Sequence, residues 1–476
     1  MRVAILTSEA VPFAKTGGLG DVASALPKAL RAVGDVDVSL LLPLYEQTDR
    51  ALLREQLFDN LAVEWKGASQ RAGVWYSEVI GAPTFLIDAP EYFARSSVYG
   101  FRDDHERFAF FCRAALALLR RLGAPPDVVH GNDWPSGFAM AELKARRSSD
   151  AYYARTRTLF SIHNLAYQGA FDPGALPALG FAYGEVHDAF LTQGVASALK
   201  AGLLLSDMLS TVSRRYAYEI QTREQGYGLD WLLRMRRDRL VGITNGVDYD
   251  VWNPATDPHI AAHFTPDDLA GKRACKLDLL NRFSLPAEPE RPVIAIISRL
   301  VAQKGYDLIQ QVAARILETG AFFIALGAGA QEYEDFLQAL RDAAPHRVGI
   351  YKGYAGEPLA HQIEAGADIF LMPSLYEPCG LNQMYSMRYG TVPVVRATGG
   401  LDDTVANFDR ARGTGNGFKF QAYSADALLG SIYEALYCYA EPEVWRTIQV
   451  NGMRADNSWQ AAARNYVELY RVVART

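Results

Sequence analysis

Residues 3–34, VAILTSEAVPFAKTGGLGDVASALPKALRAVG, combine an apolar run, a glycine-rich segment and an amphipathic segment. The apolar run 3–8 does not alternate with polar residues, which is typical of a strand buried on both faces of a parallel sheet. The pattern over 21–34 predicts a helix. Three glycines lie between these two segments: Gly17, Gly18 and Gly20. Glycines are costly in backbone entropy, so this loop must need a bare or unusually bent backbone. Two interpretations stay open here: a loop between a strand and a helix that cradles a phosphate, or a loop that needs positive φ, with Lys15 in solvent.

The same alternation of strand and helix continues along the chain and then starts again. The first series has further apolar strands at 36–43, 127–133, 158–164, 208–213 and 240–247. A second series begins near residue 292 and has strands at 292–300, 321–329, 347–353, 367–374 and 391–400. The sequence therefore predicts an α/β protein with two Rossmann-like, doubly wound parallel-sheet domains facing a central cleft. We expect the domains to cover residues 1–245 and 246–455.

The last segment, residues 456–476, predicts one more amphipathic helix with an aromatic stripe. The residues that share its apolar face are Trp459, Ala462, Ala463, Tyr466, Val467, Tyr470 and Val473. This face must be buried against another element. The sequence leaves open whether the helix packs on the second domain or crosses back to the first.

Composition excludes several classes of protein. The 476 residues carry a net charge of −6, from 48 Lys and Arg against 54 Asp and Glu, which argues against a nucleic-acid binder with a basic face. No apolar stretch of about 18 residues predicts a membrane span, and the start of the chain does not fit a signal peptide. Four cysteines without a CxxC pair predict neither a zinc site nor a disulfide framework, so we expect a cytoplasmic protein with reduced thiols.

Two cations stand in the first loop of the second series. In SRLVAQKG, Arg299 directly follows a predicted strand and Lys304 precedes the next helix. A guanidinium fork and a compact ammonium at this spacing suit a diphosphate that leaves during a reaction. In the first series, Lys15 adds a further charge beside the glycine-rich loop, and Asp21 is placed to cap the helix that follows.

A second loop, PSLYEPCGLNQ, follows the strand predicted at 367–374. Cys379, Gly380 and Leu381 lie near the start of the next helix, where free backbone N–H groups favour an anion. Glu377 beside such an anion is unfavourable unless it binds another part of the ligand, such as sugar hydroxyls; otherwise it caps the helix. Gly399 and Gly400 form a further turn before the following helix.

Polar residues also end two strands of the first series. HGNDWPSG contains His130, Asp133 and Trp134, and SIHNLAYQG contains His163 and Asn164. Polar groups with an aromatic ring suit a carbohydrate, although such histidines can equally be hydrogen-bonded core residues. The two DxD matches, at 35–37 and 248–250, lie before a strand and in the connector, so we expect no metal site there.

Seven motifs in chain order resemble the bacterial glycogen synthase and plant starch synthase family, which are retaining glycosyltransferases of the GT-B fold. The motifs are KTGGLGDV, HGNDW, SIHN, ITNGVD, SRLVAQKG, EPCGLNQ and GTVPVVRATGGLDDTV, and they span residue 15 to about 405. The resemblance implies transfer of glucose from ADP-glucose to the non-reducing end of an α-1,4-glucan such as glycogen. It implies no cofactor, no metal, no nucleic-acid partner and no membrane, and it indicates no oligomeric state.

The resemblance also implies roles for individual residues. The first domain would be the acceptor side and the second the nucleotide-sugar side. Catalytic roles fall to Glu377, Arg299, Lys304 and His163. Donor contacts fall to Lys15, Gly17, Gly18, Asp21, Asp133, Asn164, Asn245, Tyr354, Cys379, Gly380, Leu381, Gly399 and Gly400. Trp134 and Tyr167 would lie on the acceptor side.

Two positions separate this chain from broader relatives. Related retaining enzymes carry a second glutamate eight positions after the first, where this chain has Tyr385, and Asn382 stands where some members have Thr. Three alternatives stay open: a synthase that uses UDP-glucose, an α-glucan phosphorylase, which would need pyridoxal phosphate and about twice this length, and a glucan-binding protein without activity.

Overall fold

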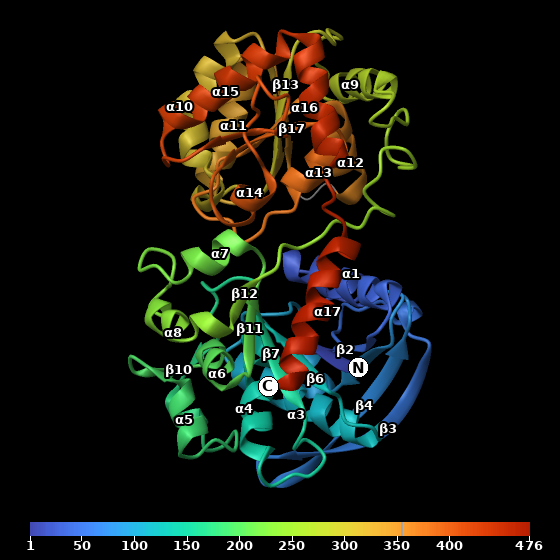
Figure 1. Ribbon diagram of the computed structural model, residues 1–476, viewed down its shortest axis with the longest axis vertical. Coiled ribbons are helices and arrows are strands. Elements are labelled where there is room, and N and C mark those ends of the chain that lie inside the picture. The colour runs from blue at the N-terminus through green and yellow to red at the C-terminus, as the bar shows by residue number, and fades with distance from the viewer. Residues whose placement is uncertain (354–355) are drawn as a thin grey trace. The chain divides into compact units, whose positions relative to one another are not determined.

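The computed structural model describes residues 1–353 and 356–476, and these residues divide into two units. Unit 1 comprises Met1–Gly246 together with Trp459–Thr476, and unit 2 comprises Val247–Ser458. The terminal helix α17 (Trp459–Arg475) therefore belongs to unit 1, and Figure 1 shows it beside α1 (Gly18–Val33). No helix in the described ranges combines the length and apolar character that a bilayer crossing requires.

Unit 1 contains a nine-stranded sheet with the order β12-β11-β7-β6-β1-β2-β5-β4-β3. The seven parallel strands are β1 (Arg2–Leu6), β2 (Asp37–Pro43), β5 (Thr84–Asp88), β6 (Val128–Asn132), β7 (Arg157–Ile162), β11 (Met208–Thr211) and β12 (Leu240–Gly242). In the register, Ile5 of β1 lies opposite Leu40 of β2 on one side and His130 of β6 on the other. The carboxyl ends of β1, β6 and β7 therefore lie next to one another at one edge of the sheet.

The edge of this sheet is antiparallel, which the sequence prediction of a purely parallel sheet missed. β3 (Glu55–Trp65) and β4 (Ala68–Ser77) form a hairpin, and β4 pairs antiparallel with β5. The turn consists of Lys66 and Gly67, whose φ angles are +49° and +78°. Positive φ at both central residues is typical of the tight hairpin turns that match strand twist.

Two helical layers cover the parallel part of the sheet. On one face, α1 and α17 pack on β1, β2 and β6, and the buried side of α17 is the predicted aromatic stripe with Leu469 added. On the other face lie α3 (Asp104–Arg121) and α4 (Asp133–Arg146). Because both faces are covered, the strands read as continuous apolar runs, which explains why they were visible in the sequence.

The remaining elements of unit 1 are short. They are the helices α2 (Pro90–Phe93), α5 (Glu185–Phe190), α6 (Ala198–Leu205), α7 (Arg214–Glu219) and α8 (Asp230–Met235), the 3₁₀ turns η1 (Arg50–Leu52), η2 (Pro173–Ala175) and η3 (Arg237–Arg239), and a small sheet of β8 (Ala170–Phe171), β9 (Leu191–Thr192) and β10 (Val195–Ser197).

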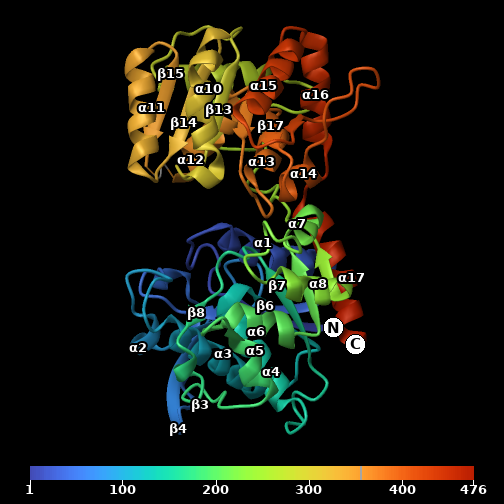
Figure 2. The ribbon, with the colours of Figure 1, turned by 90° about the vertical axis from the view of Figure 1, so that its left-hand side faces the viewer.

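Unit 2 contains a six-stranded parallel sheet with the order β15-β14-β13-β16-β17-β18 (Figure 2). Its strands are β13 (Val293–Ile297), β14 (Phe322–Gly327), β15 (Val348–Lys352), β16 (Ile369–Met372), β17 (Val392–Arg396) and β18 (Phe418–Phe420). Strand order reverses between β13 and β16, and ligands of open α/β sheets bind at the carboxyl ends of strands at such a reversal.

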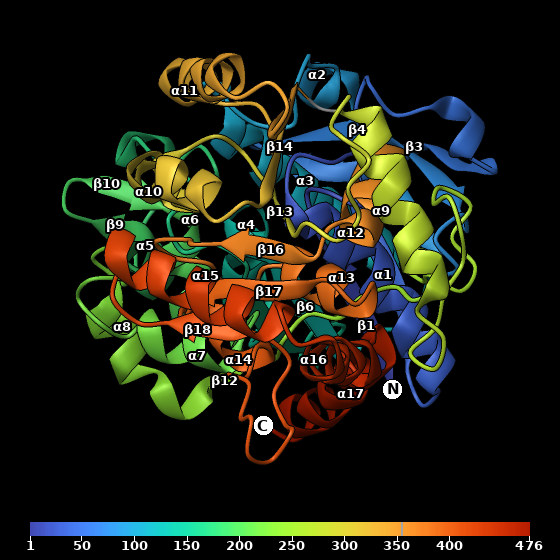
Figure 3. The same cartoon turned by 90° about the horizontal axis from the view of Figure 1, so that it is seen from above.

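Alternating residues of β13 serve two separate cores. Ile294 and Ile296 pack with α10 (Tyr306–Glu318), α11 (Gln331–Ala343), α15 (Ala425–Tyr439) and α16 (Pro442–Arg454). Val293 and Ala295 pack with α9 (Ala270–Arg282), α12 (Gly356–Gly366) and α14 (Gly399–Thr404). Figure 3 shows β13, β16 and β17 with α10 and α15 on one side and α9, α12 and α13 (Asn382–Arg388) on the other.

The start of unit 2 is a connector that docks through aromatic stacking. Trp252 lies between the rings of His361 and Tyr385, with centroid distances of 3.8 and 3.9 Å and nearly parallel planes. Asp257 accepts hydrogen bonds from Tyr389 and from the ring of His361. Tyr385, at the position of the second glutamate in broader relatives, is thus held in the packing between α12 and α13 by the connector.

Candidate active site

The glycine-rich loop after β1 does not use its glycines for unusual backbone angles. Gly17 has an extended backbone with φ −146°, and neither Gly18 nor Gly20 has positive φ. A Cβ atom added at Gly17 or Gly18 would meet no atom within 4 Å. Steric crowding inside unit 1 therefore does not require these two glycines. That a ligand approaches this bare backbone closely stays a prediction.

A buried carboxylate holds this loop. Glu9 is only 3% exposed, and its Oε2 accepts hydrogen bonds from the backbone N–H groups of Thr16 and Gly17, the latter at 2.9 Å. Its Oε1 accepts a hydrogen bond of 2.6 Å from the hydroxyl of Tyr99. The sequence analysis missed both residues. Glu9 was visible as an acid directly after a buried strand, but its partner Tyr99 is 90 positions away.

Lys15 and Asp21 form an ion pair at the start of α1, with Nζ and Oδ1 2.7 Å apart and both side chains about one-third exposed or more. The prediction that Asp21 caps the helix is wrong, because α1 already begins at Gly18 and its N-cap residue is Gly17, which has no side chain to accept a capping hydrogen bond. Asp21 lies in the first turn, where a negative charge is favourable.

The ends of β6 and β7 bring Asp133, His163 and Asn164 together as expected. Asp133 Oδ1 accepts hydrogen bonds from the backbone N–H groups of His163, at 2.7 Å, and Asn164, at 3.4 Å. Burial raises the pKa of Asp133 to about 7, against the lowering effect of those two hydrogen bonds, and Glu9 raises it further. Burial lowers the pKa of His163 to about 4, so its imidazole is neutral at pH 7.

Three other residues of this cluster have different surroundings. His130 lies in the core between the sheet and α17, bonded to Tyr470 Oη at 2.8 Å and Ser161 Oγ at 2.6 Å, and burial lowers its pKa to about 3. It is a structural histidine. Trp134 packs edge-on against Phe108 and lies against the backbone of Gly169, so its ring is only partly accessible. Tyr167 is 57% exposed.

Asn245 follows β12 and is 7% exposed. Its Oδ1 is buried and accepts no hydrogen bond from any residue that the structure describes. An unpaired buried acceptor costs free energy, and such groups concentrate where function requires them.

In unit 2, Lys304 and Glu377 form an ion pair across two strand-end loops. Lys304 follows β13 and Glu377 follows β16, and Nζ lies 2.5 Å from Oε2, with side-chain exposures of 18% and 9%. Ser374 Oγ donates to the same Oε2 at 3.1 Å. Gly305, with φ +82°, permits this approach, because a Cβ there would lie 2.3 Å from the carbonyl oxygen of Pro373.

Arg299 is exposed beside this pair and uses a different partner. Its Nη2 donates to Gln303 Oε1 at 3.2 Å, and Gln303 in turn donates to the Tyr376 carbonyl and accepts from the Leu375 N–H. Among the described residues no carboxylate forms a salt bridge with Arg299. Gln303, which the sequence analysis did not single out, thus links the loops after β13 and β16.

Close contacts in the folded chain account for three glycines near Glu377. A Cβ at Gly399 would lie 1.8 Å from the Glu377 carbonyl oxygen, and one at Gly400 would lie 2.2 Å from that of Cys379. Gly380 has φ +70° and lies against Gln383. The 377–381 loop is therefore clamped between α13, whose N-cap is Leu381, and the turn that starts α14. Asn382 ties α13 to β13 through the Ile297 carbonyl at 3.0 Å.

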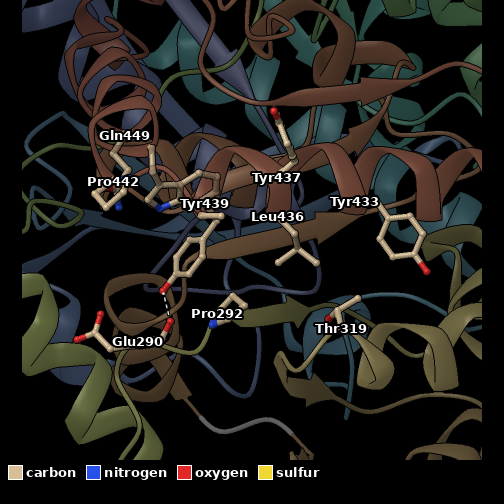
Figure 4. A pocket seen from close by; sticks show the side chains of 11 residues that line it. Glu290, Pro292, Thr319, Tyr433, Leu436, Tyr437, Tyr439, Pro442 and Gln449 are labelled. Atoms are coloured by element: carbon tan, nitrogen blue, oxygen red, sulfur yellow. Dashed lines mark hydrogen bonds between the residues drawn. The ribbon is translucent and has the colours of Figure 1, made fainter.

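Other features of the structure do not coincide with the predicted residues. Tyr354 lies outside the described residues. An open pocket of about 820 Å³ lies between α15, the start of α16 and residues 290–292 (Figure 4), and the predicted site residues within the described ranges do not line it. Across the same ranges, no group of three His, Cys, Asp or Glu residues is arranged to hold a metal ion.

Comparison with known proteins assigns the family. Residues 2–235 match the starch synthase catalytic domain, and residues 279–448 match the group 1 glycosyl transferases. The chain is 44% identical over 481 residues to a glycogen synthase of Koribacter versatilis, which covers 99% of this chain and 98% of the relative. The chain belongs to the glycogen synthase and starch synthase family. Its glycogen synthase relatives establish it as a glucosyltransferase with a nucleotide-sugar donor and a glucan acceptor.

Further relatives of the family extend this assignment to the fold. A glycogen synthase of Anaeromyxobacter dehalogenans is 45% identical over 485 residues, covering all of both chains. The catalytic domain of starch synthase IV from Arabidopsis thaliana, solved with ADP and acarbose, is similar with a TM-score of 0.90 and 34% identity, covering 100% of this chain and 99% of that one. The prediction of the GT-B fold is confirmed.

Proposed function

We propose that this chain transfers glucose from ADP-glucose to the non-reducing end of an α-1,4-glucan, with retention of the α configuration. The observation that carries the proposal is the Lys304–Glu377 pair at the ends of β13 and β16, where the strand order of the unit 2 sheet reverses. It is supported by the starch synthase IV relative, which was solved with ADP and acarbose.

In this proposal, the two cations of unit 2 act on the donor diphosphate. Negative charge grows on the departing phosphate while the sugar becomes oxocarbenium-like. Arg299 and Lys304 stabilise that charge, and Lys15 with the backbone N–H groups of Gly17 and Gly18 contributes from unit 1. Backbone groups of Cys379, Gly380 and Leu381 contact the donor, next to the turn made by Gly399 and Gly400.

Glu377 binds hydroxyls of the transferred glucose and does not attack its anomeric carbon. Its Oε2 is already engaged by Lys304 and Ser374, which fixes the carboxylate and leaves Oε1 for sugar hydroxyls. The acceptor hydroxyl then attacks from the face on which the phosphate leaves, and the departing phosphate takes its proton. The sugar lies against His163, Asp133 and Asn164, and Asn245 completes the donor site. The acceptor contacts Trp134 and Tyr167.

The test of the donor is nucleotide release from ADP-glucose and from UDP-glucose, with glycogen present. We expect ADP-glucose to be used with the higher kcat/KM. A preference for UDP-glucose would overturn the assignment of the donor while leaving the glucosyltransferase activity intact. An NMR spectrum of the first product would show an α linkage if the configuration is retained, and a β linkage would contradict the mechanism.

We also propose that the transfer needs no divalent cation, because Lys15, Arg299 and Lys304 supply positive charge to the diphosphate. Turnover in excess EDTA should equal turnover in magnesium. Loss of activity after chelation, restored by added magnesium, would show that a metal ion takes part.

A further inference from the structure

The ring of His163 has two different nitrogen environments. Its Nε2 lies 2.8 Å from Asn132 Oδ1, and both residues are buried, with exposures of 9% and 3%. Its Nδ1 forms no hydrogen bond with any residue that the structure describes. The group that the Asn132 amide presents to Nε2 therefore decides which of the two nitrogens carries the proton of a neutral imidazole.

The orientation of the Asn132 amide is itself fixed. Its Nδ2 donates to the carbonyl oxygen of Leu6 at 3.1 Å, at the end of the neighbouring strand β1. Rotation of the amide by 180° would place Oδ1 against that carbonyl oxygen and Nδ2 against the ring, and the two oxygens would repel each other. Oδ1 therefore faces His163 Nε2, and because an amide oxygen only accepts, Nε2 must carry the proton.

We propose that Asn132 is a positioning residue that holds His163 as the Nε2–H tautomer, so that its Nδ1 selects a donor sugar with a hydroxyl group at the facing position. This rests on the proposed function. A lone pair at Nδ1 accepts a hydrogen bond from a hydroxyl, and a sugar without that hydroxyl leaves the nitrogen unpaired in a buried site. Sites built in this way discriminate against the deoxy analogue.

The charges around the ring are consistent with a neutral imidazole. Asp133 faces the backbone of His163 and not its ring nitrogens, and burial lowers the pKa of His163 to about 4. His130 is a further titratable group nearby, two residues before Asn132 on β6. Burial, and in addition the charge of His163, lower the pKa of His130. Glu9 acts on Asp133 from the loop after β1.

The direct test measures the tautomer in the unmodified protein. The ring ¹⁵N chemical shifts of the eight histidines distinguish protonated from unprotonated nitrogens, and the His163→Phe variant assigns the signals by their loss. Between pH 6 and pH 8 we expect Nε2 to be protonated and Nδ1 to be unprotonated. A proton on Nδ1, or an imidazolium at pH 6, would overturn the proposal whether or not the chain uses ADP-glucose.

The second test measures selection. With ADP-glucose and its 2-, 3-, 4- and 6-deoxy analogues, one analogue should lose roughly tenfold to hundredfold in kcat/KM through the unpaired Nδ1. Asn132→Ala should abolish most of that difference. Thr211→Ala is the matched control, because it removes a buried 2.7 Å hydrogen bond to the Ile162 carbonyl without touching the ring. Discrimination that survives Asn132→Ala, or disappears equally in Thr211→Ala, would refute the assignment. Wild-type protein without turnover would refute only the proposed function.

Discussion

The ion pair of Lys304 and Glu377 predicts that stability and turnover respond differently to the same substitutions. In Lys304→Met, a carboxylate that is 9% exposed loses its counterion. Removal of one partner from a buried pair costs about 3–5 kcal/mol, and we expect about 3 because 18% of the lysine side chain reaches solvent. Glu377→Gln keeps an oxygen that accepts from Nζ, so its cost should be about 1–2 kcal/mol. The double variant buries no unpaired charge and should recover most of this loss.

Turnover should not recover in the double variant, because the diphosphate still lacks a cation. Loss of one well-placed donor at a developing anion costs about 2.7–4 kcal/mol, which lowers kcat about a hundredfold to a thousandfold. Urea unfolding measures the first effect in the transition of unit 2, and ADP release measures the second. Lys419→Met is the matched control, since Lys419 pairs with Asp402 at 2.7 Å with similar exposures of 18% and 25%. Normal stability of Lys304→Met, or restored turnover in the double variant, would refute the reasoning.

Three further substitutions test other parts of the site. Arg299→Ala should raise the KM for ADP-glucose and lower kcat by about two powers of ten at unchanged thermal stability, because the one hydrogen bond of its guanidinium to a described residue goes to the Gln303 amide. A wild-type kcat/KM would remove its role. Glu9→Gln leaves a neutral amide with a single accepting oxygen where a carboxylate accepts from two backbone N–H groups and the Tyr99 hydroxyl. It should cost about 1–3 kcal/mol in urea unfolding together with a higher donor KM. Glu91→Gln, on an exposed carboxylate, is the control. The pKa of Asp133, about 7 in the fold, lies above that of a free aspartate, so the folded state binds the extra proton and stability falls as pH rises from about 4 to 7. Because the residue as a whole is only partly buried, we expect a fall of roughly 2–4 kcal/mol, which Asp133→Asn should remove. Identical pH dependence of unfolding in both proteins would contradict the raised pKa of this carboxyl.

The sequence predicted those parts of the fold whose signal is local. Both parallel sheets have strands buried on two faces, so each appears as a continuous apolar run such as residues 3–8. The β3–β4 hairpin was missed because one of its faces is largely exposed, and charged residues interrupt its apolar positions. The signal that could have found it is Lys66-Gly67 between two alternating segments, which is a two-residue turn.

The same distinction between local and long-range signals applies to the residues of the candidate site. The sequence singled out Asp133, His163, Lys304 and Glu377 because each lies at or after the end of a predicted strand, and the carboxyl ends of neighbouring strands meet. Residues that act through distant partners were not found. Asn132 depends on a carbonyl oxygen 126 positions earlier, and Glu9 depends on Tyr99. Gly399 was visible as a turn, but the reason for it, a carbonyl oxygen at 1.8 Å from an added Cβ, exists only in the folded chain.

Two carboxylates, Glu9 and Glu377, lie beside groups that are expected to bind phosphate, and the structure shows a partner for each. Glu9 accepts hydrogen bonds from two backbone N–H groups and a hydroxyl, so these donors engage its carboxylate and hold the loop, while no atom lies within 4 Å of a Cβ added at Gly17 or Gly18. Glu377 is neutralised by Lys304, so the loops after β13 and β16 carry one net positive charge, which comes from Arg299. An ammonium has three N–H groups, and Lys304 can keep its bond to Glu377 while another N–H reaches a phosphate oxygen. In the proposed mechanism, the pair couples the two ends of the donor, because one cation would both orient the carboxylate at the sugar and stabilise the departing phosphate.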